Sequence, residues 1–518
     1  MEKPKVRISV RNLVEFILRS GDLDNSRGSS GDKEAMLKGG RLHRKIQRSM
    51  KGNYQAEVSL KRESEYEDVI IQVEGRADGI FTEDGEFWID EIKGTYGNLQ
   101  AMEVPVPVHR AQAMCYGWIY GEKEGLSQIG IQMTYSHLDT EDTRRFREIF
   151  SMEELKNWYQ KLLDDYHKWI SCSLSWKKER NASMKDLQFP FPYREGQREI
   201  VSGVYHTVSS KKTLFVQAPT GVGKTMSAIF PSVRAIGEGK GETLFYLTAK
   251  TITGTVAWEA FHTLRENGLK FKVTAITAKE KLCFLDSPEC TPEKCPYAKG
   301  HFDRVNDAVY ELWTTEEVYS REVIRAHAEK WQVCPFEMCL DLSVWVDGVI
   351  CDYNYAFDPN VHLKRFFGEN ISGDYIFLID EAHNLVERGR EMYSAEISRQ
   401  TLFTLRKKIR KHFPKLARAL DKASRQMLEL EEDLKASQNP YQVLSNPGVL
   451  PVTFLTISGE LEEILEEKNL EEELRKEILE FYFVVRDFLN VSELVDENYV
   501  VYTECFGEND FRLRLFCV

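Results

Sequence analysis

The sequence predicts an α/β protein of several domains, and three observations lead to this fold class. Short apolar runs alternate with helix-forming stretches through the middle of the chain, as in "ETLFYLTAKT" and "DYIFLIDEAHN". A glycine-rich loop, "APTGVGKT", follows an apolar run and precedes a stretch with helical periodicity. The length of 518 residues favours three or four domains over one core. Strands flanked by helices in this way predict a parallel sheet with helices on both faces.

Composition excludes several classes of protein. Hydrophobic residues make up 42% and charged residues 29%, which is ordinary for a soluble globular chain. The sequence lacks a run of about eighteen apolar residues and a recognisable signal peptide, so no membrane partner and a cytoplasmic location are expected. The net charge of −13 argues against binding nucleic acid by bulk charge, although a local basic groove remains compatible with it. The ten cysteines are not expected to form a disulfide framework.

Periodicity and composition divide the chain into consecutive stretches. Helix and strand signals mix in the first, and the second has apolar residues at helical spacing. The last stretch ends in the alternating run "ENDFRLRLFCV", which predicts a strand returning to the parallel sheet. The expected domains are 1–150 (mixed), 151–188 (helical connector), 189–280 with 346–390 (parallel sheet), 281–345 (cysteine-rich insertion), 391–495 (all-helical) and 496–518 (return strand).

The glycine-rich loop fits the phosphate-binding pattern, with alanine in place of the first glycine. It follows the expected strand "TLFVQ" and precedes the expected helix "TMSAIFPSVRAI". Glycines let backbone amides face phosphates, and the helix N-terminus adds a favourable dipole. Lys224 can reach the β- and γ-phosphates of ATP, and Thr225 can ligate Mg²⁺. The expected nucleotide-binding residues here are Pro219, Thr220, Gly221, Val222, Gly223, Lys224 and Thr225.

An acidic motif ends another apolar strand, in "YIFLIDEAHN". The carboxyl ends of parallel strands share one edge of a sheet, so Asp380 and Glu381 are expected to stand beside the phosphate loop. Asp380 suits a magnesium ligand, directly or through water. Glu381 suits the base that orients the attacking water.

These two motifs resemble those of superfamily 2 helicases, and the cysteine-rich insertion is similar to that of the XPD/DinG group. The resemblance implies a RecA-like helicase lobe with an iron–sulfur insertion and a helical arch over 391–495, moving 5′ to 3′ on single-stranded or forked DNA. It implies that Gln197, in "YREGQREI", reads adenine. The segment "YLTAKT" is similar to the next helicase motif, which implies DNA contacts from Thr248 and Lys250. "VICDYNYAFDP" resembles the segment before the acidic box.

Four cysteines of the insertion have the spacing C-x6-C-x4-C-x38-C. Four thiolates can hold either zinc or an iron–sulfur cluster, and their chemistry alone does not choose between them. The XPD/DinG resemblance implies a [4Fe–4S] cluster. Cys339 and Cys351 are expected to be buried or incidental thiols, although Cys339 has a spacing that makes it a competitor. The expected ligands are Cys283, Cys290, Cys295 and Cys334.

A second set of polar residues lies near the front of the chain, in "GRADGIFTEDGEFWIDEIKG". Residues two apart on a strand share a face, so Glu91 and Lys93 should point together while Ile92 packs in the core. Asp78 and Glu91 can bind Mg²⁺ or Mn²⁺, which polarises a phosphate and acidifies water. Lys93 can position or deprotonate that water, or offset charge in the transition state.

Further residues extend this set. His43 lies upstream in "GGRLHRKIQ", and Gln112 and Tyr116 lie downstream in "HRAQAMCYGWIY". The order H…GxxD…ExK…QxxxY is similar to that of the RecB-like PD-(D/E)xK nucleases. The resemblance implies a nuclease fold over 1–150, in which His43 is a third metal ligand and Gln112 and Tyr116 place DNA. The alternative is a nuclease fold kept only for binding DNA.

The helicase resemblance stops before a second RecA-like lobe, because no "SAT"-like motif follows the acidic box. We therefore expect a truncated motor or a partner chain that supplies this lobe, and weak ATP binding without DNA unwinding by the chain alone. The leading hypothesis is an ATP-dependent DNA helicase and nuclease of DNA repair or processing. The alternatives are a catalytically inactive DNA-binding regulator and an iron–sulfur redox sensor that gates DNA affinity.

Overall fold

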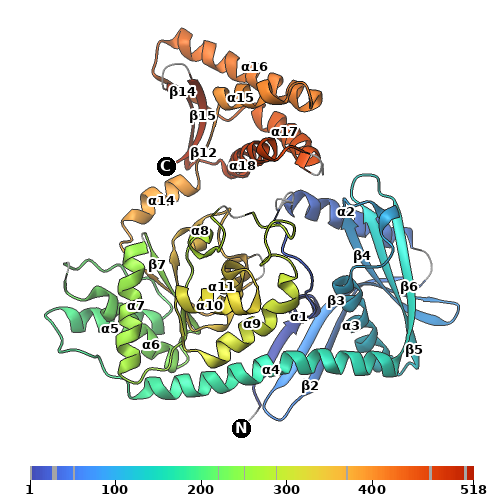
Figure 1. The fold of residues 1–518 in the computed structure, drawn as a ribbon, viewed down its shortest axis with the longest axis vertical. Coiled ribbons are helices and arrows are strands. Elements are labelled where there is room, and N and C mark those ends of the chain that lie inside the picture. Colours follow the sequence, from blue (N-terminus) through green and yellow to red (C-terminus); the bar gives the residue numbers. More distant parts are fainter. Residues whose placement is uncertain are drawn as a thin grey trace.

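The computed structural model describes residues 3–25, 32–50, 53–219, 221–249, 251–286, 289–368, 371–465, 470–506 and 510–518. These residues form a front domain, a long connecting helix, a middle domain and a C-terminal domain (Figure 1). The expected mixed α/β architecture with a parallel sheet is confirmed. None of the described helices is both long and apolar enough to cross a bilayer.

The front domain is built on a sheet of order β1-β3-β4-β5-β6, with β2 paired to β3. β4 and β5 run parallel and are joined through α3, which packs with α1 and the connecting helix in the main core of this domain. Leu42 and Ile46 of α2 pack on Ile92 of β4. The elements are β1 Lys5–Ser9, α1 Val10–Ile17, α2 Asp32–Ser49, β2 Gln55–Glu65, β3 Ile70–Glu83, β4 Glu86–Thr95, the 3₁₀ turn η1 Leu99–Ala101, α3 Pro107–Glu124, β5 Gln128–His137 and β6 Thr143–Ser151.

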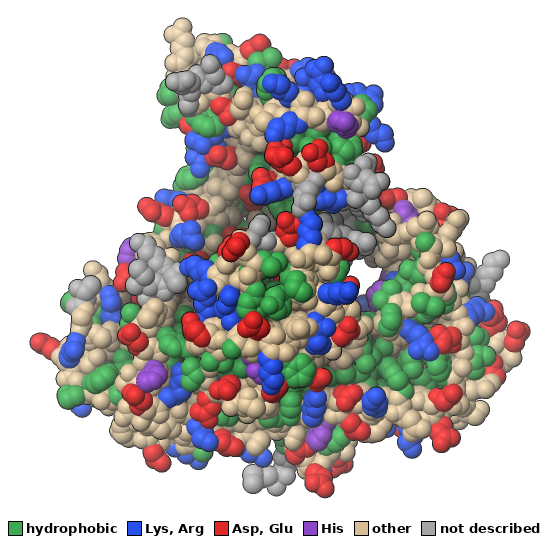
Figure 2. Space-filling model, in the orientation of Figure 1, with side chains coloured by type: hydrophobic (Ala, Val, Ile, Leu, Met, Phe, Trp, Pro, Cys, Tyr) green, Lys and Arg blue, Asp and Glu red, His purple; other side chains and the backbone are tan. Residues whose placement is uncertain are grey.

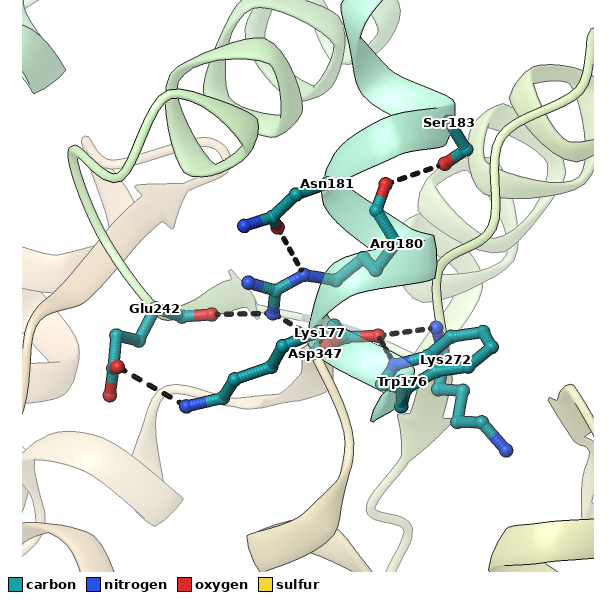
Figure 3. A network of polar contacts seen from close by, with 8 residues as sticks. All are labelled: Trp176, Lys177, Arg180, Asn181, Ser183, Glu242, Lys272 and Asp347. Atoms are coloured by element: carbon teal, nitrogen blue, oxygen red, sulfur yellow. Dashed lines mark hydrogen bonds and ion pairs between the residues drawn. The ribbon is translucent and has the colours of Figure 1, made fainter. Parts of the chain in front are cut away.

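A single helix, α4 (Met152–Lys185), joins the front and middle domains. Its first half buries Leu155 in the front core, and its second half buries Trp169 and Met184 in the cores of the middle domain. Near its end Arg180 forms an ion pair of 2.7 Å with Asp347, which precedes β10 (Figure 3). The helix is therefore fastened at both ends.

The middle domain contains an all-parallel sheet of order β11-β7-β10-β8-β9. Leu244 and Tyr246 of β7 pack with α6 and α7, while Phe245 and Leu247 pack with the cysteine-rich helices on the other face. Because both faces of this sheet are buried, the sequences of its strands are continuous apolar runs. The elements are α5 Gln197–Ser209, α6 Lys224–Gly237, β7 Thr243–Thr248, α7 Thr251–Glu266, β8 Val273–Ala275, α8 Lys279–Leu282, α9 His301–Thr315, β9 Val318–Tyr319, α10 Arg321–Trp331, α11 Pro335–Leu342, η2 Ser343–Trp345, β10 Gly348–Asp352, α12 Asn354–Phe357, α13 Lys364–Phe367, β11 Tyr375–Ile379 and α14 Asn384–Met392.

The C-terminal domain stands above the other two in Figure 1 and is reached through α14. Its helices pack on one face of an antiparallel sheet of order β12-β15-β14-β13. The elements are β12 Ala395–Ser398, α15 Arg399–Ile409, α16 Pro414–Ser437, β13 Tyr441–Leu444, α17 Leu450–Leu465, α18 Glu472–Leu494, β14 Tyr499–Phe506 and β15 Asp510–Cys517.

Two expectations about the end of the chain are wrong. Residues 496–518 do not return to the parallel sheet, because β14 and β15 form a hairpin that pairs with β13 and β12. The alternation in this run buries Phe511, Leu513 and Leu515 in the C-terminal core, as suits an antiparallel strand covered on one face. Residues 391–495 are not all-helical either, since they contribute β12 and β13 to the same sheet.

The apolar run 213–217 before the phosphate loop is also not the expected strand. Leu214, Phe215 and Val216 are 42%, 88% and 44% exposed. An extended segment becomes a strand only when the backbone of a neighbour pairs with it, and no described strand pairs with this segment. β11 is the last strand of the described sheet at one edge.

Candidate active sites

The front carboxylates gather where β3 and β4 separate. Just beyond the last paired residues of these strands, the Asp78 carboxylate accepts the N–H of Ile92 at 2.7 Å. Glu91 and Lys93 share one face of β4 and form an ion pair of 2.8 Å. His43 reaches the group from α2, with its Nδ1 atom 3.6 Å from Oδ1 of Asp78. The structure therefore brings together His43, Asp78, Glu91 and Lys93.

The electrostatics of this group suit a bound cation. Burial, reinforced by the charge of Asp78, raises the pKa of Glu91 to about 7. Burial opposes protonation of His43, but contact with Asp78 outweighs it and raises the pKa of the imidazole. The Oε2 atom of Glu91 is buried without a hydrogen-bond partner. Burying an unpartnered polar atom costs free energy, and a bound cation would remove that cost. Within the described ranges no three Cys, His, Asp or Glu side chains already stand as a metal site, so the fit rests on the donor set and this oxygen.

One face of α3 looks toward the same group. His109, Gln112 and Tyr116 follow one another at helical spacing. Burial, and then the charge of Glu91, raises the pKa of Tyr116. Gln112 is buried, and its Oε1 atom has no partner. Sequence reasoning missed His109, whose pKa is lowered to about 4 by burial and by nearby Lys93; its spacing from Gln112 was the available signal.

The phosphate loop leads directly into α6, which begins at Lys224. Gly223 has a φ of 83°, and a Cβ there would lie 2.7 Å from the side-chain nitrogen of Gln197, so only glycine fits. The Lys224 ammonium donates to the carbonyl of Ala218 at 3.3 Å and lies 3.8 Å from Oε1 of Glu381. Of the expected loop residues, Thr220 lies outside the described residues. The others are Pro219, Gly221, Val222, Gly223, Lys224 and Thr225.

Two tyrosines that sequence reasoning missed contact the acidic box, and one of them, Tyr246, also reaches the phosphate loop. The Tyr246 hydroxyl on β7 donates to the Asp380 carboxylate, and its oxygen lies 3.4 Å from the Thr225 hydroxyl oxygen. Tyr353 donates to the backbone carbonyls of Asp380 and Glu381. Burial raises the pKa of Asp380, and the charge of Glu381 adds to the rise. Thr225 and Asp380 therefore come together as a hydroxyl–carboxylate pair.

Gln197 and Thr248, the residues expected to read adenine and to contact DNA, are both buried. Gln197 is 4% exposed, and its side-chain amide accepts the N–H of Arg194 and donates to the carbonyl of Val222, each at 3.0 Å. In this arrangement Gln197 supports the phosphate loop. Thr248 is buried at the end of β7, and Lys250 lies outside the described residues.

The four candidate cluster ligands are free thiols of the insertion. Cys295 and Cys334 pack in one small buried group. Lys279 begins α8, and Cys283 caps the end of that helix. Burial opposes the charge of Lys279, but its hydrogen bond to the Cys290 thiol outweighs burial and raises the pKa of the ammonium. The donor chemistry fits a cluster, although no ready three-ligand set exists among the residues described.

The two competing cysteines lie elsewhere. Cys339 is buried in the core against the parallel sheet, with its sulfur 3.7 Å from the Thr274 hydroxyl. Cys351 is buried within β10. Burial raises the pKa of both thiols. Both cysteines pack as small apolar residues in this core.

A segment of the front domain, 19–25, crosses directly to the cysteine-rich insertion. Arg19 pairs with Asp341 at 2.8 Å, and Leu23 packs beside Cys295 and Cys334. The backbone hydrogen bonds are Phe302 N–H to Gly21 O at 2.9 Å, Leu23 N–H to Ala298 O at 2.8 Å and Asn25 N–H to Cys290 O at 2.9 Å. The insertion and the front domain are therefore one packed unit at this point.

Comparisons with known proteins bear on the middle of the chain. The DEAD_2 family model matches residues 264–402. A probable ATP-dependent helicase of Methanocaldococcus jannaschii is 40% identical over 201 residues, which are 38% of this chain and 29% of that protein. A regulator of telomere elongation helicase 1 homolog of Caenorhabditis briggsae is 23% identical over 42% of this chain and 26% of its own length. The XPD helicase subunit of transcription and repair factor IIH from Arabidopsis thaliana is 22% identical over 42% of this chain and 33% of its own length.

The chain thus spans a third or less of the length of these relatives. A solved structure titled "XPD_Helicase" overlaps 62% of this chain and 54% of its own at a TM-score of 0.39 and 17% identity, which is too loose an overlap to carry an argument. The middle of the chain is therefore similar to the DEAD_2 family and to helicases of the XPD type, and the acidic box lies within the matched residues.

Proposed function

We propose that this chain is an ATP-dependent DNA helicase of the XPD/DinG type, moving 5′ to 3′, whose front domain cuts DNA with a divalent metal ion. One observation carries the motor half. Lys224 of the loop lies 3.8 Å from Glu381 of the acidic box, while Tyr246 joins Thr225 to Asp380. The loop thereby supplies the Lys224 ammonium for the phosphates, and the loop and the acidic box together supply the oxygens of Thr225 and Asp380 for Mg²⁺.

In the motor, Lys224 binds the terminal phosphates, which replace its present contacts with Glu381 and the Ala218 carbonyl. Thr225 and Asp380 would hold Mg²⁺, whose charge offsets the charge that develops during phosphoryl transfer. Glu381 orients the attacking water. Its backbone has a φ of 50° and its carbonyl accepts from Tyr353, so its position is fixed before ATP arrives.

In the front domain, His43, Asp78 and Glu91 would hold Mg²⁺ or Mn²⁺, which supplies a polarised phosphate and a more acidic water. Glu91 must lose its proton to act as a ligand. Its partner Lys93 then positions or deprotonates the water, or offsets the charge of the transition state. Gln112 and Tyr116, on the face of α3 that looks toward these carboxylates, place the DNA.

The four thiols of the insertion are proposed to hold a [4Fe–4S] cluster, with zinc as the alternative. The support is that all four are free and that Lys279 links two of the segments that carry them. A cluster gives a brown protein whose iron and sulfide can be assayed, whereas zinc gives a colourless one. The proposed ligands are Cys283, Cys290, Cys295 and Cys334.

Two assays on the purified protein test the proposal. ATP hydrolysis stimulated by single-stranded DNA should be lost in Lys224→Ala and kept in the control Lys240→Ala, an exposed lysine beyond the same helix. Cleavage of labelled DNA with Mg²⁺ or Mn²⁺ should be lost in Glu91→Ala and kept in the control Glu103→Gln, an exposed carboxylate of the same domain. Wild-type protein that binds DNA but neither cuts it nor hydrolyses ATP, even at saturating nucleotide, is the inactive regulator.

We also propose that unwinding needs a second helicase lobe, which the described residues do not contain and which comes from a partner chain or from a longer polypeptide. The support is the open edge of the sheet at β11 and the exposure of Leu214, Phe215 and Val216 ahead of the phosphate loop. The isolated chain is then expected to bind ATP weakly and to leave forked DNA paired. Robust unwinding by the 518-residue chain alone would refute this part of the proposal.

A further inference from the structure

Positive charge is concentrated on two helices of the C-terminal domain. Residues 406–425, "RKKIRKHFPKLARALDKASR", contain nine Lys and Arg residues and one acidic residue, Asp421. The whole chain has a net charge of −13, so this segment departs sharply from its surroundings. In Figure 2 basic side chains gather at the top of the molecule, over α15 and α16.

Four of these charges form a line on one helix. Lys415, Arg418, Lys422 and Arg425 follow one another along α16 at steps of three, four and three residues, which places them on one face. The opposite face, which includes Leu416, is buried in the domain core. At about 1.5 Å per residue the line is roughly 15 Å long. Three further exposed cations, on or just after α15, are Lys407, Arg410 and Lys411.

The protein itself neutralises few of these cations. Arg406 pairs with Asp421 at 2.6 Å, and Lys408 pairs with Glu477 at 2.5 Å. The Nε atoms of Arg418 and Arg425 donate only to backbone carbonyls. In the described parts of the chain, no carboxylate pairs with the other seven: Lys407, Arg410, Lys411, Lys415, Arg418, Lys422 and Arg425. We call these seven residues the α15–α16 basic face.

Like charges three and four residues apart repel one another, so this face is stabilised when an anion of matching spacing binds it. One DNA strand in a duplex presents a phosphate about every 3.4 Å along the axis. A line of roughly 15 Å therefore covers about four phosphates of one strand, and it presents four cations. The line contains no aromatic side chain on which an unpaired base could stack.

We propose that the α15–α16 basic face binds the phosphate backbone of duplex DNA, independently of sequence and apart from the motor and the cutting site. This inference rests on the proposed function in one respect, that the protein works on DNA. It adds a duplex contact on the C-terminal domain, which neither the phosphate loop nor the front carboxylates provide. Charge complementarity and the matching spacing carry it.

The test replaces the line with neutral side chains, in the variant Lys415→Gln, Arg418→Gln, Lys422→Gln and Arg425→Gln. The matched control makes the same change of net charge at four other exposed lysines, Lys61, Lys156, Lys161 and Lys178, each to Gln. Binding of a labelled duplex and of a single strand is measured by fluorescence anisotropy across a range of salt. All substituted residues are exposed, and a thermal melt verifies that both variants fold.

Each phosphate contact contributes about 0.9 to the slope of log affinity against log salt. Loss of four contacts should reduce the slope for the duplex by about three to four and weaken binding at least about tenfold near 0.1 M salt. The control variant should keep the wild-type slope. An equal loss in both variants would mean bulk charge alone, and a loss for single-stranded DNA but not for the duplex would assign the face to single strands. An unchanged salt slope in the quadruple variant would mean that the α15–α16 basic face does not bind DNA and would favour an acidic protein as its partner. Each of these three results overturns the proposal.

The proposed function is tested separately on the same preparations. ATP hydrolysis and cleavage of a short single strand should be unchanged in the quadruple variant, because no substituted residue lies in either site. If the wild-type protein shows neither activity but the duplex slope still depends on α16, the proposed function fails and this inference stands.

Discussion

The ion pair between Arg180 and Asp347 offers a sharp test of how the connecting helix is fastened. Both side chains are 5% exposed, and their nitrogen and oxygen atoms lie 2.7 Å apart. The Asp347 carboxylate also accepts from Trp176 Nε1 at 2.8 Å and from the N–H of Lys272 at 2.9 Å (Figure 3). Replacing Arg180 with methionine keeps the volume of the side chain but leaves a buried carboxylate without its cation.

Breaking a buried ion pair from one side costs about 3–5 kcal/mol. The two remaining donors still solvate Asp347 in part, so we expect the low end, about 3 kcal/mol for Arg180→Met. For a domain of this size that corresponds to a fall in the melting temperature of roughly 6–12 °C. Scanning calorimetry measures it on the transition that includes the middle domain. Adding Asp347→Asn to Arg180→Met should recover part of the loss, because the amide removes the uncompensated charge and keeps an acceptor.

Lys177 provides the matched control on the same helix. Its ion pair with Glu242 is 3.2 Å long, and its partners are 41% and 62% exposed. Solvent-exposed pairs contribute about 0–1 kcal/mol, so Lys177→Met should leave the transition within about 2–4 °C of wild type. Equal melting temperatures for wild type and Arg180→Met would refute the reasoning, because Asp347 would then have to be solvated by something other than Arg180.

Three further predictions concern the sites and the packing between domains. The folded-state pKa of Glu91 lies near 7, above its ordinary 4.5, so its contribution to stability should decline as pH rises between these values. Because Mn²⁺ must displace the protons of Glu91 and of His43, whose pKa is also raised, its affinity should rise at least about tenfold per pH unit below 7, as calorimetric titration would show; a flat profile would remove both residues from the metal site. Gln197→Ala should weaken ATP and GTP binding alike, since the side chain supports the loop; a loss confined to ATP would restore the adenine-reading role. Arg19→Ala should speed hydrogen exchange at the amides of Leu23 and Asn25. Unchanged protection of these amides would show that the ion pair between Arg19 and Asp341 does not stabilise the contact of segment 19–25 with the insertion.

Local patterns in the sequence predicted much of what surrounds each site. The two-residue step from Glu91 to Lys93 required a shared face once the strand was recognised, and the structure has them on one face of β4. The change from glycine-rich loop to helical periodicity predicted that a helix begins at the loop, and α6 begins at Lys224. These features depend on neighbours within a few residues, so a short stretch of sequence is enough to predict them.

Other features depend on partners that are distant in sequence. The run 213–217 has the composition of a strand, but strand formation needs a neighbouring backbone, and none of the described strands pairs with this run. Tyr246 joins the acidic box to the loop only because β7 pairs with β11, and Tyr353 reaches the backbone of the acidic box from the end of β10. No spacing rule marks such residues in advance.

The sequence by itself determined that the chain is a mixed α/β protein with a phosphate loop, an acidic box, a front group of carboxylates and a cysteine-rich insertion. Each of these is a property of residue type and short-range spacing. Only the tertiary structure decided that the last two strands close the C-terminal sheet, that segment 19–25 packs on the insertion, and that no carboxylate of the described residues pairs with the α15–α16 basic face. Those outcomes follow from which surfaces bury one another and which charges find partners, and both are set by contacts between residues far apart in the chain.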